Sequence, residues 1–132
     1  MMRALRHTLL ILLIGMSQLA VAGVQIDADA NGVAIQGHDP VAYFTEEKPV
    51  KGAASHSTEY NGATWHFSSA ENKAAFEAAP ADYAPHFGGY CAYAVSRGYT
   101  APTDPDAWSV VDGKLYLNFS LRARELWSQD IP

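Results

Sequence analysis

Cysteine is almost absent from this sequence, because Cys91 is the only one among 132 residues. A single thiol cannot form a disulfide within its own chain, although proteins of oxidising compartments commonly use cysteines in pairs. Cys91 is therefore a buried apolar residue, a link to another molecule, or a reactive or metal-binding group. The sequence also lacks a phosphate-binding glycine loop, a serine nucleophile motif and a convincing pair of catalytic carboxylates, so an enzyme is the less favoured class.

Basic residues are also few in this chain. It has 9 Lys and Arg against 14 Asp and Glu, which gives a net charge of −5. An acidic surface disfavours nucleic acid and anionic lipid as partners, and it mildly favours cations. Aromatic residues make up 11% of the sequence, which is enough to build the core of one small domain.

Long apolar runs are limited to one short stretch near the N-terminus. Arg3 and Arg6 precede the apolar residues 9–14, and residues 20–22 read as a small-residue cleavage site. This order is typical of a secretory signal peptide over residues 1–22, and the run is short for a membrane span. We therefore expect a periplasmic or secreted protein that keeps no membrane segment after cleavage.

The rest of the chain, about 110 residues, has the size of one domain. Residues 23–36 are expected to form an N-terminal lead-in, and residues 37–132 the domain. Asn61-Gly62 and Asp112-Gly113 each lie between segments with strand patterns, and each therefore predicts a β-hairpin. The expected strands are residues 58–60 with 64–67, and residues 108–111 with 114–119.

Short helices are predicted around these hairpins. Ser68 and Glu71 fit a capping box, which places a helix over residues 70–79. Asp39 is expected to cap a short helix that begins at Pro40. Other helical segments are expected at residues 80–83, 90–97 and 121–128, and a loop at residues 100–106. These elements predict a small α+β domain, with short helices packed on two β-hairpins.

The middle of the chain also carries a linear pattern. Asp39-Pro40-Val41-Ala42 is followed by residues 60–69, which hold Tyr60, Gly62, Trp65 and Phe67, and then by Asn72, Phe76, Pro80 and Tyr83. This pattern resembles the YHS domain family, a small α+β module related to the heavy-metal-binding TRASH domains. Residues 37–44, 67–72 and 88–92 are further similar to exported, single-domain members of that family. The resemblance implies the fold.

Three positions depart from the thiol-bearing members of that family. Their pattern contains D-P-V-C and then F-C-S-x-x-C, whereas this chain has Ala42, Ser68 and Asn72 at the three cysteine positions. Soft-metal binding through these positions is therefore not expected here.

Cys91 is the remaining candidate for soft-ligand chemistry. It follows two glycines and is expected in the first turn of a helix, where free N–H groups and the helix dipole stabilise a thiolate. His38, His56 and His86 are the histidines that the expected fold could bring near it. A thiolate with two or three imidazoles suits copper or zinc. The sequence therefore predicts a copper or zinc site formed by Cys91, His38 and His56, with His86 as a further ligand.

Three functions follow from these alternatives. In the favoured one, the protein binds copper or zinc as a carrier or sensor, without turnover. In the second, Cys91 is oxidised to a sulfenic acid and an external thiol resolves it, because the chain has no second cysteine. In the third, Cys91 is buried and the domain binds another protein, such as a periplasmic one.

Overall fold

The computed structural model describes residues 25–132, so the predicted signal peptide lies outside the described residues. The elements follow in the order η1 (Ile35–Gly37), α1 (Ala42–Thr45), β1 (Ala53–Tyr60), β2 (Ala63–Phe67), α2 (Ala70–Ala78), α3 (Pro80–Tyr83), η2 (His86–Gly89), α4 (Ala92–Ser96), β3 (Asp104–Val111), β4 (Lys114–Asn118) and α5 (Leu121–Ser128), where η marks a short 3-10 helix. The expected α+β fold is confirmed. Within this part of the chain, no helix is long and apolar enough to cross a membrane.

Both predicted hairpins are present as separate two-stranded antiparallel sheets, β1 with β2 and β3 with β4. The first turn has φ of 49° at Asn61 and 78° at Gly62, and the second has 52° at Asp112 and 74° at Gly113. Two successive positive φ angles are the geometry of the type I′ turn, which suits the right-handed twist of the strands. The turn residues therefore identified both hairpins correctly.

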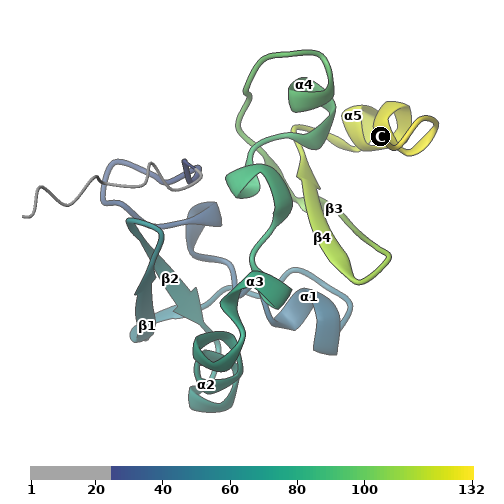
Figure 1. The fold of residues 1–132 in the computed structure, drawn as a ribbon. Coiled ribbons are helices and arrows are strands. Elements are labelled where there is room, and N and C mark those ends of the chain that lie inside the picture. Colours follow the sequence, from purple (N-terminus) through teal and green to yellow (C-terminus); the bar gives the residue numbers. More distant parts are fainter. Residues whose placement is uncertain (1–24) are drawn as a thin grey trace, which may run out of the picture.

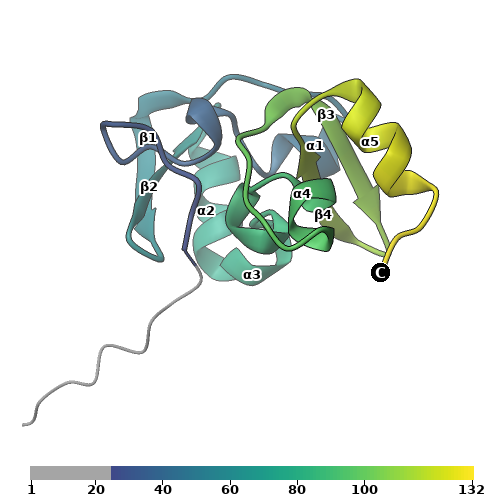
Figure 2. The same ribbon diagram turned by 90° about the horizontal axis from the view of Figure 1, so that it is seen from above.

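The two hairpins lie on opposite sides of the molecule, with α3 and η2 between them (Figures 1 and 2). Their inner faces nevertheless share one core. In β2, Trp65 and Phe67 are fully buried while His66 between them is partly exposed, as the two-residue period of a strand requires. Phe76 of α2 packs on both rings at centroid distances of 5.4 and 5.1 Å, as expected from its position on the helix.

The described part of the lead-in, residues 25–36, is packed against this core. Ala34 and Ile35 are buried, and Val33 forms a parallel bridge with Thr64 at the free edge of β2. Further along, the backbone N–H of Asp27 donates to the carbonyl of Gly88 at 2.9 Å. This segment therefore holds η2 in place from the outside.

Several element boundaries differ from the expected ones. The side chain that caps α2 is Ser69, not Ser68, because Ser69 Oγ accepts from Asn72 N at 3.1 Å. The helix after the two glycines begins at Ala92, with Cys91 as its N-cap. The expected loop at residues 100–106 is wrong at its end, because Asp104 already pairs with Asn118. An irregular register between Asp104 and Trp108 hid this part of the strand from the sequence pattern.

Helices α4 and α5 lie together beside the β3–β4 hairpin (Figure 2). Between them is a small second cluster of buried residues, Cys91, Ala94 and Ala123, with Tyr93 and Ala101 packed against it. This arrangement places the only cysteine of the chain under the second hairpin, away from the large aromatic core.

Candidate functional site

Cys91 lies at the junction of α4 and β4, with only 1% of its surface exposed. Its Sγ accepts from Phe119 N at 3.2 Å and from Ala94 N at 3.5 Å. The second of these bonds caps α4, so Cys91 lies just before the helix and not in its first turn, where it was expected. The sulfur therefore links the end of β4 to the start of α4.

Asn118 is the third hydrogen-bond partner of Cys91. Its Oδ1 accepts from Tyr93 N at 3.0 Å and lies 3.5 Å from Cys91 Sγ. Because an amide oxygen only accepts, the contact is a hydrogen bond when Cys91 is a thiol and donates. Asn118 is fully buried, and its Nδ2 has no hydrogen-bond partner among the described residues. Sequence reasoning did not identify this asparagine, because it lies 27 positions from Cys91.

An apolar groove of about 350 Å³ opens above this junction. Its lining residues are Cys91, Tyr93, Ala94, Tyr99, Ala101, Phe119, Ser120, Arg122, Ala123 and Leu126. Tyr99 and Phe119 are 56% and 57% exposed, although both are large and apolar. Exposed aromatic groups beside an apolar hollow mark a surface that can hold a ligand or a partner.

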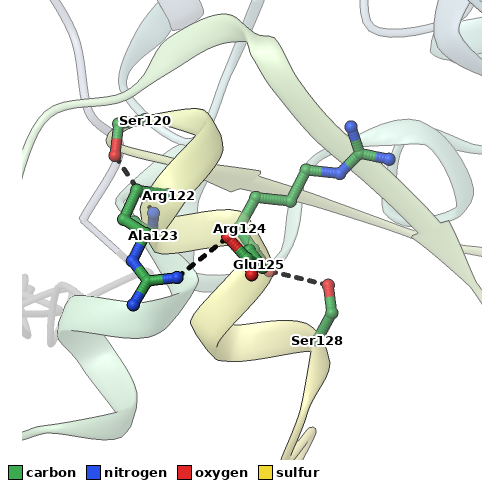
Figure 3. A network of polar contacts seen from close by, with 6 residues as sticks. All are labelled: Ser120, Arg122, Ala123, Arg124, Glu125 and Ser128. Atoms are coloured by element: carbon green, nitrogen blue, oxygen red, sulfur yellow. Dashed lines mark hydrogen bonds and ion pairs between the residues drawn. The ribbon is translucent and has the colours of Figure 1, made fainter.

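One wall of the groove is α5, and several of its polar side chains bond within the helix itself. Ser120 Oγ caps the helix by accepting from Ala123 N at 3.0 Å, and Arg122 contacts Glu125 at 2.9 Å (Figure 3). Arg124 extends away from Arg122 and donates through Nε to Ser109 Oγ. The Arg122–Glu125 pair is largely exposed and contributes little to stability. Because Glu125 offsets the charge of Arg122, this pair leaves the groove with little net charge.

A larger hollow of about 460 Å³ lies between α1 and β3. It is lined by residues of mixed character, among them Glu47, Trp108, Val110 and Arg124. The arginine is already bound to Ser109, and the hollow holds neither the cysteine nor a histidine. This hollow is therefore a weaker candidate for a binding site than the groove beside Cys91.

His38 lies next to Lys51, with which it forms an isolated bridge. Its Nδ1 is buried without a hydrogen-bond partner among the described residues. Burial lowers the pKa of His38, and the nearby positive charge of Lys51 lowers it further. A neutral imidazole is the form that can bind a metal, but His38 does not line the groove beside Cys91.

The other two histidines are also placed apart from this groove. His86 lies in η2 and stacks on the ring of Tyr116 at a centroid distance of 5.1 Å. Burial, followed by the charge of Lys114, lowers the pKa of His86. His56 lies in β1, within the stretch where the register between β1 and β2 shifts.

These positions bear directly on the expected metal site. Over residues 25–132, no three His, Cys, Asp or Glu side chains form a group that could hold a metal ion. The structure therefore does not bring Cys91 together with His38, His56 and His86 as a ready ligand set.

A different cluster is centred on Asp39, which is fully buried. Its Oδ1 accepts from the backbone N–H groups of Val41 and Ala42, at 2.8 and 3.3 Å. Its Oδ2 accepts from Ser68 N, Ser68 Oγ and Asn72 Nδ2, each at 2.8 Å. Asp39 was expected to cap a helix that begins at Pro40, but α1 begins at Ala42 with Val41 as its N-cap. Nothing in the sequence indicated that Asp39 also binds residues 29 and 33 positions away.

Residues 41–87 match the family model of the YHS domain. This segment is therefore similar to a YHS domain, and we call it the YHS segment. The family is associated with metals, and the resemblance found in the sequence is confirmed. No curated protein and no solved structure matches the chain. The matched residues include His56 and His86 but neither His38 nor Cys91, so the groove beside Cys91 is formed outside the YHS segment.

The side chains of this YHS segment do not fit a soft metal at the positions where the thiol-bearing members carry cysteine. Ala42 offers no ligand atom in its side chain. Ser68 and Asn72 supply a hydroxyl and an amide, and both donate to the carboxylate of Asp39. Soft metals prefer thiolates and imidazoles to such groups. The metal association of the family therefore cannot be transferred to these three positions.

Proposed function

We propose that this protein is an exported binding module, which holds an apolar side chain of a partner protein in the groove between α4 and α5. The observation that carries the proposal is the pair of exposed aromatic residues, Tyr99 and Phe119, beside an apolar groove with a buried floor. Aromatic groups are enriched in protein interfaces, and their burial supplies much of the binding energy.

The environment of the thiol supports binding over thiol chemistry. Cys91 Sγ already has three hydrogen-bond partners, Asn118 Oδ1 and the backbone N–H groups of Ala94 and Phe119. The nucleophile and the metal ligand are the thiolate, whereas this sulfur is buried and no histidine lines the groove beside it. Copper or zinc carriage at Cys91, and its oxidation to a sulfenic acid, therefore have less support than a packed thiol beneath a binding groove.

The groove can be tested with Nile red, a neutral dye that becomes fluorescent in apolar surroundings. We expect wild-type protein to bind the dye, and Phe119→Ser to weaken binding at least tenfold, or about 1.4 kcal/mol. Val110→Ser is the matched control, because Val110 is also an exposed apolar residue but lies on β3 outside the groove. Equal weakening by the two variants, or no binding by wild type, would overturn the groove as a site.

A peptide arm distinguishes a protein partner from a small apolar molecule. An amphipathic helical peptide with leucines along one face should displace the dye, and the same peptide with serines in their place should not. Dye binding that neither peptide displaces would exclude a protein partner of this type.

A metal arm uses Cu(I) and Zn²⁺ alone. Stoichiometric binding by wild type that is lost in Cys91→Ser, while Nile red still binds that variant, would replace this proposal with a metal carrier.

A further inference from the structure

The contacts of Asp39 join three separate segments at one buried point. Oδ1 receives the first N–H groups of the α1 region, from Val41 and Ala42. Oδ2 receives Ser68, at the end of β2, and Asn72, in the first turn of α2. We propose that the carboxylate of Asp39, with Ser68 and Asn72 bound to it, joins these segments in place of a metal centre, so that the domain folds without a metal.

The charges around this centre are the reverse of those in a metal site. A bound cation is surrounded by anionic or lone-pair ligands that it draws together. Here a single anion is surrounded by five donors, three from backbone N–H groups and two from side chains. Hydrogen bonds to an ionised acceptor are about twice as strong as neutral ones, so the cluster can hold the segments as a metal would.

The same arrangement leaves no place for a cation. The hydrogen atoms of all five donors point at the two oxygens of Asp39, so a cation beside this carboxylate would also face those hydrogens. Ala42, Ser68 and Asn72 are the residues at the cysteine positions of the thiol-bearing members, and each of them donates to Asp39. Two of these five bonds, from the side chains of Ser68 and Asn72, depend on the replacement of cysteine, whereas the other three come from backbone N–H groups.

The isosteric change Asp39→Asn tests this inference. An amide at this position must turn its NH₂ group toward either the two donors at Oδ1 or the three donors at Oδ2. We expect the folding equilibrium constant to fall at least a hundredfold, which corresponds to about 2.8 kcal/mol, in denaturant titrations.

Asp29→Asn is the matched control. Asp29 is exposed, and its Oδ1 alone accepts from Asn31 N and Val33 N, so an asparagine can keep both bonds. The folding equilibrium constant of this control should fall less than threefold. Asn72→Ala removes only one of the three donors at Oδ2, so its folding equilibrium constant should fall about tenfold. This variant provides the test if Asp39→Asn does not fold. Wild-type stability in Asp39→Asn or Asn72→Ala would overturn the inference.

A chelator supplies the second readout. The unfolding midpoint of wild-type protein should be the same with and without EDTA, and elemental analysis should find no stoichiometric metal. A metal whose removal lowers the midpoint would overturn the inference. Both results are independent of the groove, because Asp39 and its partners do not line it.

Discussion

At the scale of single residues, the sulfur of Cys91 acts as a hydrogen-bond acceptor within the fold. It receives the N–H groups of Phe119 and Ala94 while 1% of the residue is exposed. A thiol in this role differs from a thiol that merely fills space, because replacing it leaves two backbone donors without partners. Substitutions can therefore separate the two roles.

We expect Cys91→Ala to destabilise the protein by about 2 kcal/mol, because it leaves the N–H groups of Phe119 and Ala94 without an acceptor. Cys91→Ser should cost about 1 kcal/mol, since its hydroxyl still accepts. Denaturant unfolding of both variants measures the difference. The reverse order, with alanine the milder change, would mean that the sulfur serves only to fill space.

Sequence reasoning placed Cys91 near a helix start, because two glycines before a short apolar segment are a local signal. It could not find Asn118 or Phe119, which reach the sulfur from 27 and 28 positions away. The same limit applies to Asp39, whose contacts with Ala42 are local but whose contacts with Asn72 are not. Contacts between sequence neighbours left a signal in the sequence, whereas the groups that complete each cluster depend on tertiary packing.

At the scale of elements, the turns were the most predictable features and the helix caps the least. Asn61-Gly62 and Asp112-Gly113 fixed both hairpins, because few other residues adopt two successive positive φ angles. Ser68 and Ser69 could both cap α2 by sequence. In the structure, Ser68 Oγ donates to Asp39, and Ser69 Oγ accepts from Asn72 N and caps the helix. A neighbouring cluster thus shifted a cap by one residue.

The 3-10 segment η2 depends on a close approach of two backbones at Gly88. Gly88 has φ of +66°, and a Cβ there would overlap the carbonyl oxygen of Gln25. Gly113 has a similar φ of +74° but nothing within 4 Å of its Cβ position. We expect Gly113→Ala to cost about 1 kcal/mol through backbone strain alone. Gly88→Ala should cost about 3 kcal/mol, because Gln25 and Asp27 must also move away.

Thermal unfolding of the two glycine variants provides the comparison. Equal losses of stability would show that a Cβ at position 88 does not clash with the N-terminal segment. A larger loss for Gly88→Ala that disappears when residues 25–27 are deleted would locate the clash at the expected place.

At the scale of the whole molecule, stability should fall in mild acid. His38 and His86 both have a pKa lowered mainly by burial, so folding favours their neutral forms. The unfolded chain then binds more protons than the folded one as the pH falls below the ordinary histidine pKa of about 6.5. Their contribution is present above that pH and is lost as the pH falls through their folded pKa values.

Unfolding free energies at about pH 7.5 and pH 5 measure this effect. The wild type should be less stable at the lower pH, and the double variant His38→Gln, His86→Gln should show a smaller difference. Carboxylates titrate in both proteins alike, so the difference between the two slopes belongs to the histidines. Identical slopes would contradict the expected contribution.

Because the only thiol is buried, the rate of its chemical labelling reports how often this region opens. A thiol reagent in solution can reach the sulfur only when α4, α5 and the end of β4 separate, so each labelling event records one opening of that region. Because the chain has a single cysteine, the recording needs no engineered label and no removal of competing sites. The labelling rate of the natural protein therefore measures how often the floor of its groove opens by local unfolding.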